Sequence, residues 1–181
     1  MQNVKVGLVG AGTIGMRHIQ AIDDLEEISL VAIADPSPTV EGLVAKRAIP
    51  LYKEAKTMFE AGKLDAVIVA APTNHHYDIV MNALNHHLAV LVEKPISHSY
   101  NKAKKLISYA ESLSNTILTG YMLRFNPAVK KLKNLLEANF LGQIHNVTVD
   151  IFSFMPGWHP YENFENLYAS KKKLGGGVIL T

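Results

Sequence analysis

The sequence contains no cysteine among its 181 residues. Disulfides, thiolate catalysis and cysteine-bound zinc or iron–sulfur centres are therefore excluded for these residues. A strong charge of either sign is missing too, because 18 Lys and Arg residues against 16 Asp and Glu residues leave a net charge of +2. So weak a field argues against nucleic acid and membrane surfaces as partners.

Long apolar runs are also missing. No stretch approaches the roughly 20 apolar residues that span a bilayer, and the opening "MQNVKVGLVG" has no basic segment before a cleavable apolar one. We therefore expect no membrane association and, by default, a cytoplasmic location. The composition, 48% hydrophobic and 19% charged, is that of a globular protein with a sizeable core.

Short apolar runs are present, and they alternate with segments of helical length. The runs are typical of buried parallel strands, and they cover residues 4–10, 28–35, 64–72, 88–95 and 116–121. Helices are predicted between them, over residues 13–25, 38–47, 53–62, 75–86 and 99–113. This succession predicts an α/β fold, a Rossmann-type doubly wound parallel sheet with helices on both faces, over residues 1–122.

The pattern changes after Tyr121. Residues 127–139 predict an amphipathic helix, and residues 143–155 predict a long strand followed by a polar and aromatic loop. We interpret residues 123–181 as the incomplete beginning of a second domain, one that opens with a strand and lacks its partner strands. A strand without its sheet would expose unpaired backbone and apolar side chains, so we expect the chain to form homo-oligomers.

The motif "GAGTIG" places Gly10, Gly12 and Gly15 directly after the first strand, at the start of the first helix. In that position Gly10 permits a tight turn, Gly12 lets a pyrophosphate approach the backbone, and Gly15 permits close helix–strand packing. The helix N-terminus would supply N–H donors to the phosphates. The spacing therefore predicts dinucleotide binding; the alternative is a bare turn.

Asp35 ends the second strand, twenty residues beyond Gly15. A carboxylate there can accept hydrogen bonds from the adenosine ribose hydroxyls and would repel a 2′-phosphate. Pro36, Ser37 and Pro38 follow, with no Lys or Arg to neutralise such a phosphate. NAD is therefore favoured over NADP. The alternative role for Asp35 is to cap the following helix.

The motif "APTNHH" follows the third strand run. Ligands lie beyond the carboxyl ends of the strands in such sheets, which points to Thr73, Asn74 and His76 as site residues. Thr73 or Asn74 could also cap the helix that follows. The histidine pairs at 75–76 and 86–87 would lie about 16 Å apart along that helix, too far for one ion, so no metal site is expected.

Glu93, Lys94 and Pro95 end the next strand run at the same edge. A lysine at that edge could polarise a substrate oxygen or transfer its proton. The other interpretation is an ordinary solvated lysine, and position alone does not decide between them.

Five motifs in order, "GAGTIGMRH", "APTNHH", "EKPIS", "GYMLRFNP" and "GGGVILT", resemble the Gfo/Idh/MocA oxidoreductase family, from Val4 to the last residue. The resemblance implies an N-terminal Rossmann domain and a C-terminal α/β substrate domain with an open, mostly antiparallel sheet, of which residues 123–181 would be the incomplete beginning. It also implies hydride transfer between a nicotinamide cofactor and a sugar, sugar nucleotide, cyclitol or related compound.

By position, the resemblance implies roles for twelve residues. Gly10, Gly12, Thr13, Ile14 and Gly15 would hold the pyrophosphate, Asp35 the adenosine ribose, and Thr73, Asn74 and His76 the nicotinamide side; Glu93 and Lys94 would adjoin the nicotinamide ribose, with Lys94 also catalytic, and Arg124 would flank cofactor or substrate.

Two features stand apart from the family pattern. His87 occupies a helix C-cap where the family usually has Gly, at an expected cost of about 1 kcal/mol. The acid/base His that the family carries after its "GGG" turn would lie beyond Thr181. We therefore expect the N-terminal half of an oxidoreductase that binds NAD(H) without turnover; the alternatives are a non-catalytic NAD(H)-binding module and a structural remnant.

Overall fold

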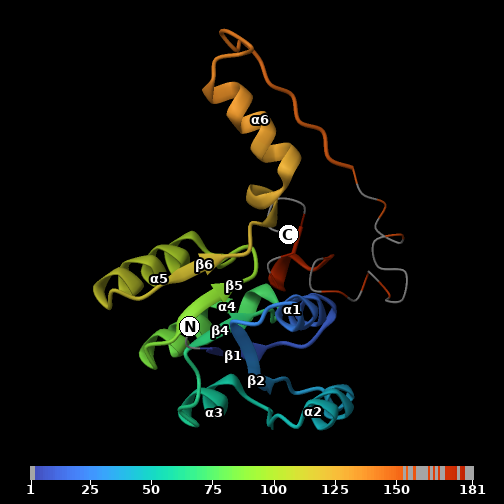
Figure 1. The fold of residues 1–181 in the computed structure, drawn as a ribbon, viewed down its shortest axis with the longest axis vertical. Helices are drawn as coiled ribbons and strands as arrows, with labels where there is room; N and C mark the ends of the chain where they lie inside the picture. The colour runs from blue at the N-terminus through green and yellow to red at the C-terminus, as the bar shows by residue number, and fades with distance from the viewer. Residues whose placement is uncertain are drawn as a thin grey trace.

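The computed structural model describes residues 3–152 and, beyond them, residues 154, 157, 163, 165, 167, 170–174 and 176–177. Within these residues the chain forms a six-stranded sheet in the order β3-β2-β1-β4-β5-β6, flanked by helices (Figure 1). Every strand pair is parallel. The strands are β1 (Val4–Val9), β2 (Ile28–Ala34), β3 (Leu51–Tyr52), β4 (Ala66–Val69), β5 (Ala89–Val92) and β6 (Ile117–Thr119).

The strand order contains one switch point, between β1 and β4. From β1 the chain moves outward through β2 to β3, returns to pair β4 with the other side of β1, and then moves outward to β6. The predicted doubly wound sheet is therefore confirmed. The prediction missed β3, which has only two residues.

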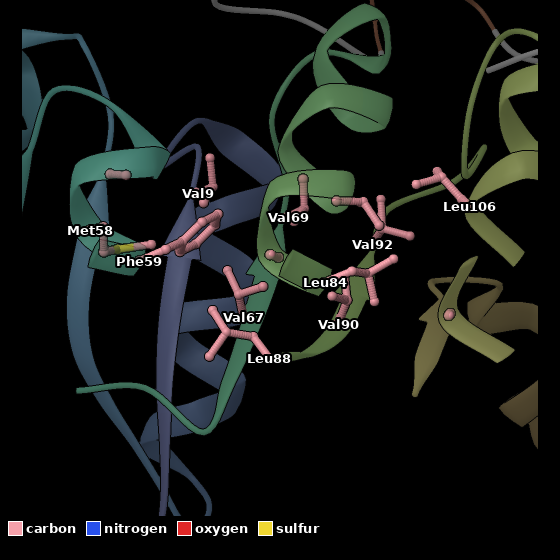
Figure 2. Packing of buried hydrophobic residues seen from close by; sticks show 14 of the residues in the cluster. Val9, Met58, Phe59, Val67, Val69, Leu84, Leu88, Val90, Val92 and Leu106 are labelled. Atoms are coloured by element: carbon pink, nitrogen blue, oxygen red, sulfur yellow. The ribbon is translucent and has the colours of Figure 1, made fainter. Parts of the chain in front are cut away.

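Alternating side chains divide the core into two layers. Leu8 of β1 and Ile33 of β2 pack on one face with α1 (Thr13–Asp23), the short η1 (Pro38–Val40) and α2 (Glu41–Arg47). Val9 and the β4 residues Val67 and Val69 pack on the other face, in the cluster of Figure 2. That face is covered by α3 (Ala55–Glu60), α4 (Thr73–Asn85) and α5 (Tyr100–Ser112).

The end of α4 confirms the expectation for His87. Its φ is 57°, and its N–H donates to the Leu84 carbonyl while the Leu88 N–H donates to the Ala83 carbonyl. This pair of backbone bonds is the Schellman motif, which calls for a left-handed residue. Ala48, Ser114 and Asn139, which end α2, α5 and α6 (Pro127–Glu137), share the positive φ.

The region after β6 contains the predicted helix but lacks the predicted strand. It forms the short helix η2 (Met122–Phe125) and then α6, which Asn126 caps through its side chain and which projects away from the sheet (Figure 1). The strand predicted over residues 143–155 is wrong, because residues 143–152 form no strand; Ser153 and Met155 lie outside the described residues. A strand requires a partner to accept and donate its backbone hydrogen bonds, and none lies beside this segment in the described part of the chain.

Two further results concern the described residues alone. No helix among them is long and apolar enough to cross a membrane, and they contain no group of three or more His, Asp or Glu side chains placed to hold a metal ion. Gly175 and Val178–Thr181 of the "GGGVILT" motif lie outside the described residues.

Candidate dinucleotide-binding site

The turn after β1 requires glycine at two of its three glycine positions. Gly10 has a φ of 87°, and a Cβ there would lie 2.8 Å from the backbone of Ala70. A Cβ at Gly15 would lie 2.1 Å from the Gly10 carbonyl oxygen. Gly10 therefore makes the turn, and Gly15 lets α1 pack against it.

Gly12 is different, because the protein's own packing does not explain it. A Cβ at Gly12 would meet no described atom within 4 Å. Gly12 is the N-cap residue of α1, with extended backbone angles that any residue adopts. Space beside a glycine at a helix N-terminus suits the close approach of a phosphate to the backbone.

The two helices that begin at the switch point, α1 and α4, start in the same way. Neither the N-cap of α1, Gly12, nor that of α4, Pro72, makes a side-chain capping hydrogen bond, and neither first turn carries an acidic residue. Helix N-termini carry partial positive charge and unpaired N–H groups, which favour anions. The alternative in which Thr73 or Asn74 caps α4 is wrong, because α4 begins at Thr73 itself.

The first turn of α4 also holds polar atoms that need a partner. Thr73 is 1% exposed, and neither its Oγ1 nor the buried Oδ1 of Asn74 has a hydrogen-bond partner in the described structure. An unsatisfied buried polar group costs about 1–3 kcal/mol. A ligand that reaches this edge of the sheet could remove that cost, so these residues fit a bound dinucleotide.

Asp35 lies beside the glycine turn, as the sequence predicts. Its Oδ2 accepts the Ala11 N–H at 2.7 Å, and its Oδ1 accepts the Ser37 N–H at 2.8 Å. The alternative of a helix cap is wrong, since Ser37 caps η1 through its own side chain. Among the described residues no Lys or Arg forms an ion pair with Asp35.

His76 lies at the same edge but is buried, with 1% of its surface exposed. Its Nε2 lies 2.7 Å from the Ala71 carbonyl oxygen, and its Nδ1 lies 2.8 Å from that of Pro95. Burial lowers the pKa of the ring more than these backbone contacts and the charge of Glu93 raise it. The ring thus lies between the end of β4 and the turn after β5, with each nitrogen beside a backbone carbonyl, and the neutral ring donates its one N–H to one of them.

Glu93 directly follows β5 and is hydrogen-bonded to a residue that the sequence interpretation missed. His18 of α1 contacts it, with 2.8 Å between Nε2 and Oε1. Burial raises the pKa of Glu93, but the hydrogen bond and charge of His18, the Lys94 N–H and the Lys94 charge lower it further, so the net pKa is below its usual value. The one signal for His18 was its place three residues after Gly15, next to the buried face of α1.

The remaining predicted residues are spread along this edge. Thr13 and Ile14 form the first turn of α1, and Lys94 follows Glu93 in a partly buried position. Arg124 is exposed in η2, after β6, two strands away from β4. No hydrogen bond or ion pair among the described residues joins Arg124 to the glycine turn. The other eleven residues follow β1 and β4, which meet at the switch point, or their outer neighbours β2 and β5, whereas Arg124 lies farther out.

A doubly wound sheet with a glycine turn, an adjacent carboxylate and two uncapped helix N-termini at its switch point defines a dinucleotide-binding domain. The chain belongs to the Gfo/Idh/MocA family, described as an oxidoreductase family with an NAD-binding Rossmann fold, whose profile matches residues 4–121. The recognition made from the five motifs is confirmed.

Curated relatives agree with this assignment. The rhizopine catabolism protein MocA of Rhizobium meliloti is 34% identical over 82% of this chain and 47% of its own length. An inositol 2-dehydrogenase of the same species is 25% identical over 81% and 44%, respectively. The chain therefore spans less than half the length of these relatives.

Solved structures show the same fold. The scyllo-inositol dehydrogenase of Lactobacillus casei, with bound NAD(H) and scyllo-inositol, superposes with a TM-score of 0.75 at 23% identity, over 78% of this chain and 43% of that one. A probable dehydrogenase of Thermotoga maritima gives 0.72 at 27% identity, over 77% and 42%.

Proposed function

We propose that this chain is the cofactor-binding part of an NAD-dependent oxidoreductase. The observation that carries the proposal is the pair of uncapped helix N-termini at the switch point, one of them beginning at Gly12 with space beside it. A dinucleotide pyrophosphate is the ligand that such a site favours. The buried, unpartnered oxygens of Thr73 and Asn74 support it independently.

The substrate class follows from the relatives rather than from the site. Inositol 2-dehydrogenases recur among them, and the Lactobacillus casei structure holds scyllo-inositol. We therefore propose that the whole protein oxidises a secondary alcohol of a cyclitol, sugar or sugar nucleotide, or reduces the corresponding ketone. The nicotinamide, when bound, accepts or donates the hydride.

The chain's own residues then have separate tasks. The N–H groups of the first turn of α1 bind phosphate, and Asp35 accepts hydrogen bonds from the adenosine ribose. Lys94 donates a hydrogen bond from Nζ to the substrate oxygen and assists the transfer of its proton. His76 holds the end of β4 and the Pro95 turn together, so that these groups keep their relative positions.

The choice of NAD over NADP rests on Asp35. A 2′-phosphate would approach a carboxylate that has no Lys or Arg paired with it among the described residues. NADH should therefore bind more tightly than NADPH, and Asp35→Ala should narrow the difference. Energy transfer from the protein's tyrosines and tryptophan to the reduced nicotinamide measures both affinities. Equal affinities in the parent chain would contradict the assignment.

The 181-residue chain should bind NADH without measurable turnover. Loss of a positioned acid/base typically lowers the reaction rate ~10²–10⁴-fold, and loss of substrate orientation lowers the rate further. The test combines an NADH titration with NAD reduction by a panel of cyclitols, sugars and sugar nucleotides. Robust turnover would contradict the proposal that this chain binds the cofactor but does not catalyse the reaction by itself. Failure to bind NADH would leave only a structural role for the chain.

A non-catalytic NAD(H)-binding module is the second candidate. The same glycine turn supports it, because the turn binds the cofactor in a module and in an enzyme alike. The mass of the native protein separates the two: a mass near twice the 19.9 kDa of this chain supports the enzyme, and a native protein of this mass that binds NADH supports the module.

A further inference from the structure

The hydrogen bond between His18 and Glu93 joins two elements that are not neighbours in the sheet. His18 lies in the second turn of α1, which follows β1, and Glu93 directly follows β5. Since β4 separates β1 from β5, the bond crosses the switch point. Both side chains are 21% exposed, and the atoms are 2.8 Å apart.

Glu93 is held at its backbone and at its carboxylate. The backbone N–H of Glu93 donates to the Val69 carbonyl of β4 at 2.9 Å, and the backbone nitrogen of Lys94 lies 3.4 Å from the carboxylate Oε2 of Glu93. Gly120, just after β6, leaves room for it, because a Cβ there would lie 3.1 Å from Oε1. The carboxylate thus links α1 to the turn after β5, the Glu93 backbone is bonded to β4, and Gly120 after β6 lies close by.

Charge makes this contact strong. The titratable groups that face Glu93 are His18 from α1, His76 from α4 and Lys94 from its own turn. His18 and Lys94 lower the pKa of Glu93 by more than burial raises it, so the group is a carboxylate at neutral pH. Hydrogen bonds to an ionised acceptor are about twice as strong as neutral ones.

We propose that His18 is a positioning residue for cofactor binding: through Glu93 it fixes the Lys94–Pro95 turn relative to the phosphate-binding end of α1. The inference rests on the proposed function. A dinucleotide is held at its pyrophosphate by one element and at its nicotinamide end by another. A bond that sets the spacing of the two elements before binding lowers the cost of ordering them when the ligand arrives.

The experiment measures NADH affinity in the 181-residue chain, in five variants and in a control variant. His18→Leu removes the donor, whereas His18→Gln keeps an N–H close to the position of Nε2. We expect about tenfold weaker binding in His18→Leu and recovery to within about twofold in His18→Gln. In a Glu93→Gln background, His18→Leu should cost less than about twofold, because the two residues act as a unit. Gly120→Ala, which crowds Oε1, should weaken binding severalfold without changing either partner.

Arg47→Met is the matched control. Arg47 forms a two-point ion pair with Asp23 at the other end of α1, so its loss removes a tether of α1 away from the carboxyl edge. NADH affinity should not change in this variant. If His18→Leu does not fold, two variants still test the inference: His18→Gln should keep the NADH affinity of the unmodified chain, and Gly120→Ala should weaken it.

Each result has one meaning. If the unmodified chain binds NADH and His18→Leu binds it with the same affinity, the positioning role is overturned and the proposed function stays intact. The same holds if His18→Leu and His18→Gln lose NADH affinity equally. A parent chain that fails to bind NADH overturns the proposed function and this inference with it. Unfolding measurements on the same variants show whether stability changes in parallel; an effect on stability alone also overturns the inference.

Discussion

His87 is held with a φ of 57° by the backbone bonds that end α4, and its side chain is exposed. An L-residue in this conformation is strained, whereas glycine adopts it freely. His87→Gly should therefore raise the free energy of unfolding by about 1 kcal/mol, measured by urea denaturation. His86→Gly is the control: residue 86 has a φ of −95°, so glycine there should lower stability. Equal effects of the two changes would contradict the argument.

Two groups at the carboxyl edge predict how stability depends on pH. The pKa of His76 is lowered from 6.5 in the folded chain by burial, so protonation favours unfolding and stability should fall as pH drops below about 6.5. Burial raises the pKa of Glu93, but the hydrogen bond and charge of His18 together with Lys94 lower it by more, so the net pKa lies below 4.5. Its contribution is present above that value and is lost as pH falls further.

Urea unfolding at a series of pH values tests both stages. The loss that begins below about pH 6.5 should be smaller in His76→Gln, and the loss below about pH 4.5 should be smaller in Glu93→Gln. An NMR titration of the His76 ring with a midpoint above 6.5 would contradict the first stage.

The positions of Gly10 and Asp35 in the fold could be predicted from the sequence because local rules govern them. A turn directly after a strand requires a glycine, and a carboxylate at the end of the second strand lies beside that turn. The roles of His18 and His76 could not be predicted in the same way. Their partners, Glu93 and Pro95, are 75 and 19 residues away in the chain, and only the folded arrangement brings them together.

At the scale of elements, the turn and α1 allow the effects of two glycines to be separated. Gly15→Ala places a methyl 2.1 Å from the Gly10 carbonyl, and should cost at least about 1–3 kcal/mol of stability. Gly12→Ala meets no described atom within 4 Å, so stability should stay close to that of the parent while NADH affinity falls. Thermal unfolding and NADH titration measure the two effects. A large loss of stability in Gly12→Ala would show that packing, rather than a ligand, explains this glycine.

Strands could be predicted from the sequence where their side chains are buried on both faces of the sheet. Central strands such as β1 and β4 read as apolar runs because helices cover both sides. β3 is too short to produce a run, and residues 143–152 show an apolar alternation without a neighbouring strand. Alternation records which side chains would share a face; it does not supply the partner that makes a strand.

The whole molecule exposes a continuous series of large apolar side chains after β6. Phe125 is 72% exposed, Phe140 74% and Phe152 92%, and the apolar side chains Leu132 and Leu136 of α6 are exposed as well. Such surfaces promote association. The chain should self-associate with rising concentration, and Leu132→Lys together with Leu136→Lys should reduce this. Sedimentation velocity measures it; a clean monomer at high micromolar concentration would contradict the prediction.

The seam between β1 and β4 also has a consequence for the speed of folding. Val6 and Ala66 pair across it although sixty residues separate them, whereas the other neighbouring strands pair residues fewer than thirty apart. Each half of the sheet can thus form from local contacts, while joining the halves requires closure of the longest loop. We expect the seam to form in the transition state. Val67→Ala in β4 should then slow refolding in stopped-flow experiments, whereas Leu51→Ala in β3 should mainly accelerate unfolding.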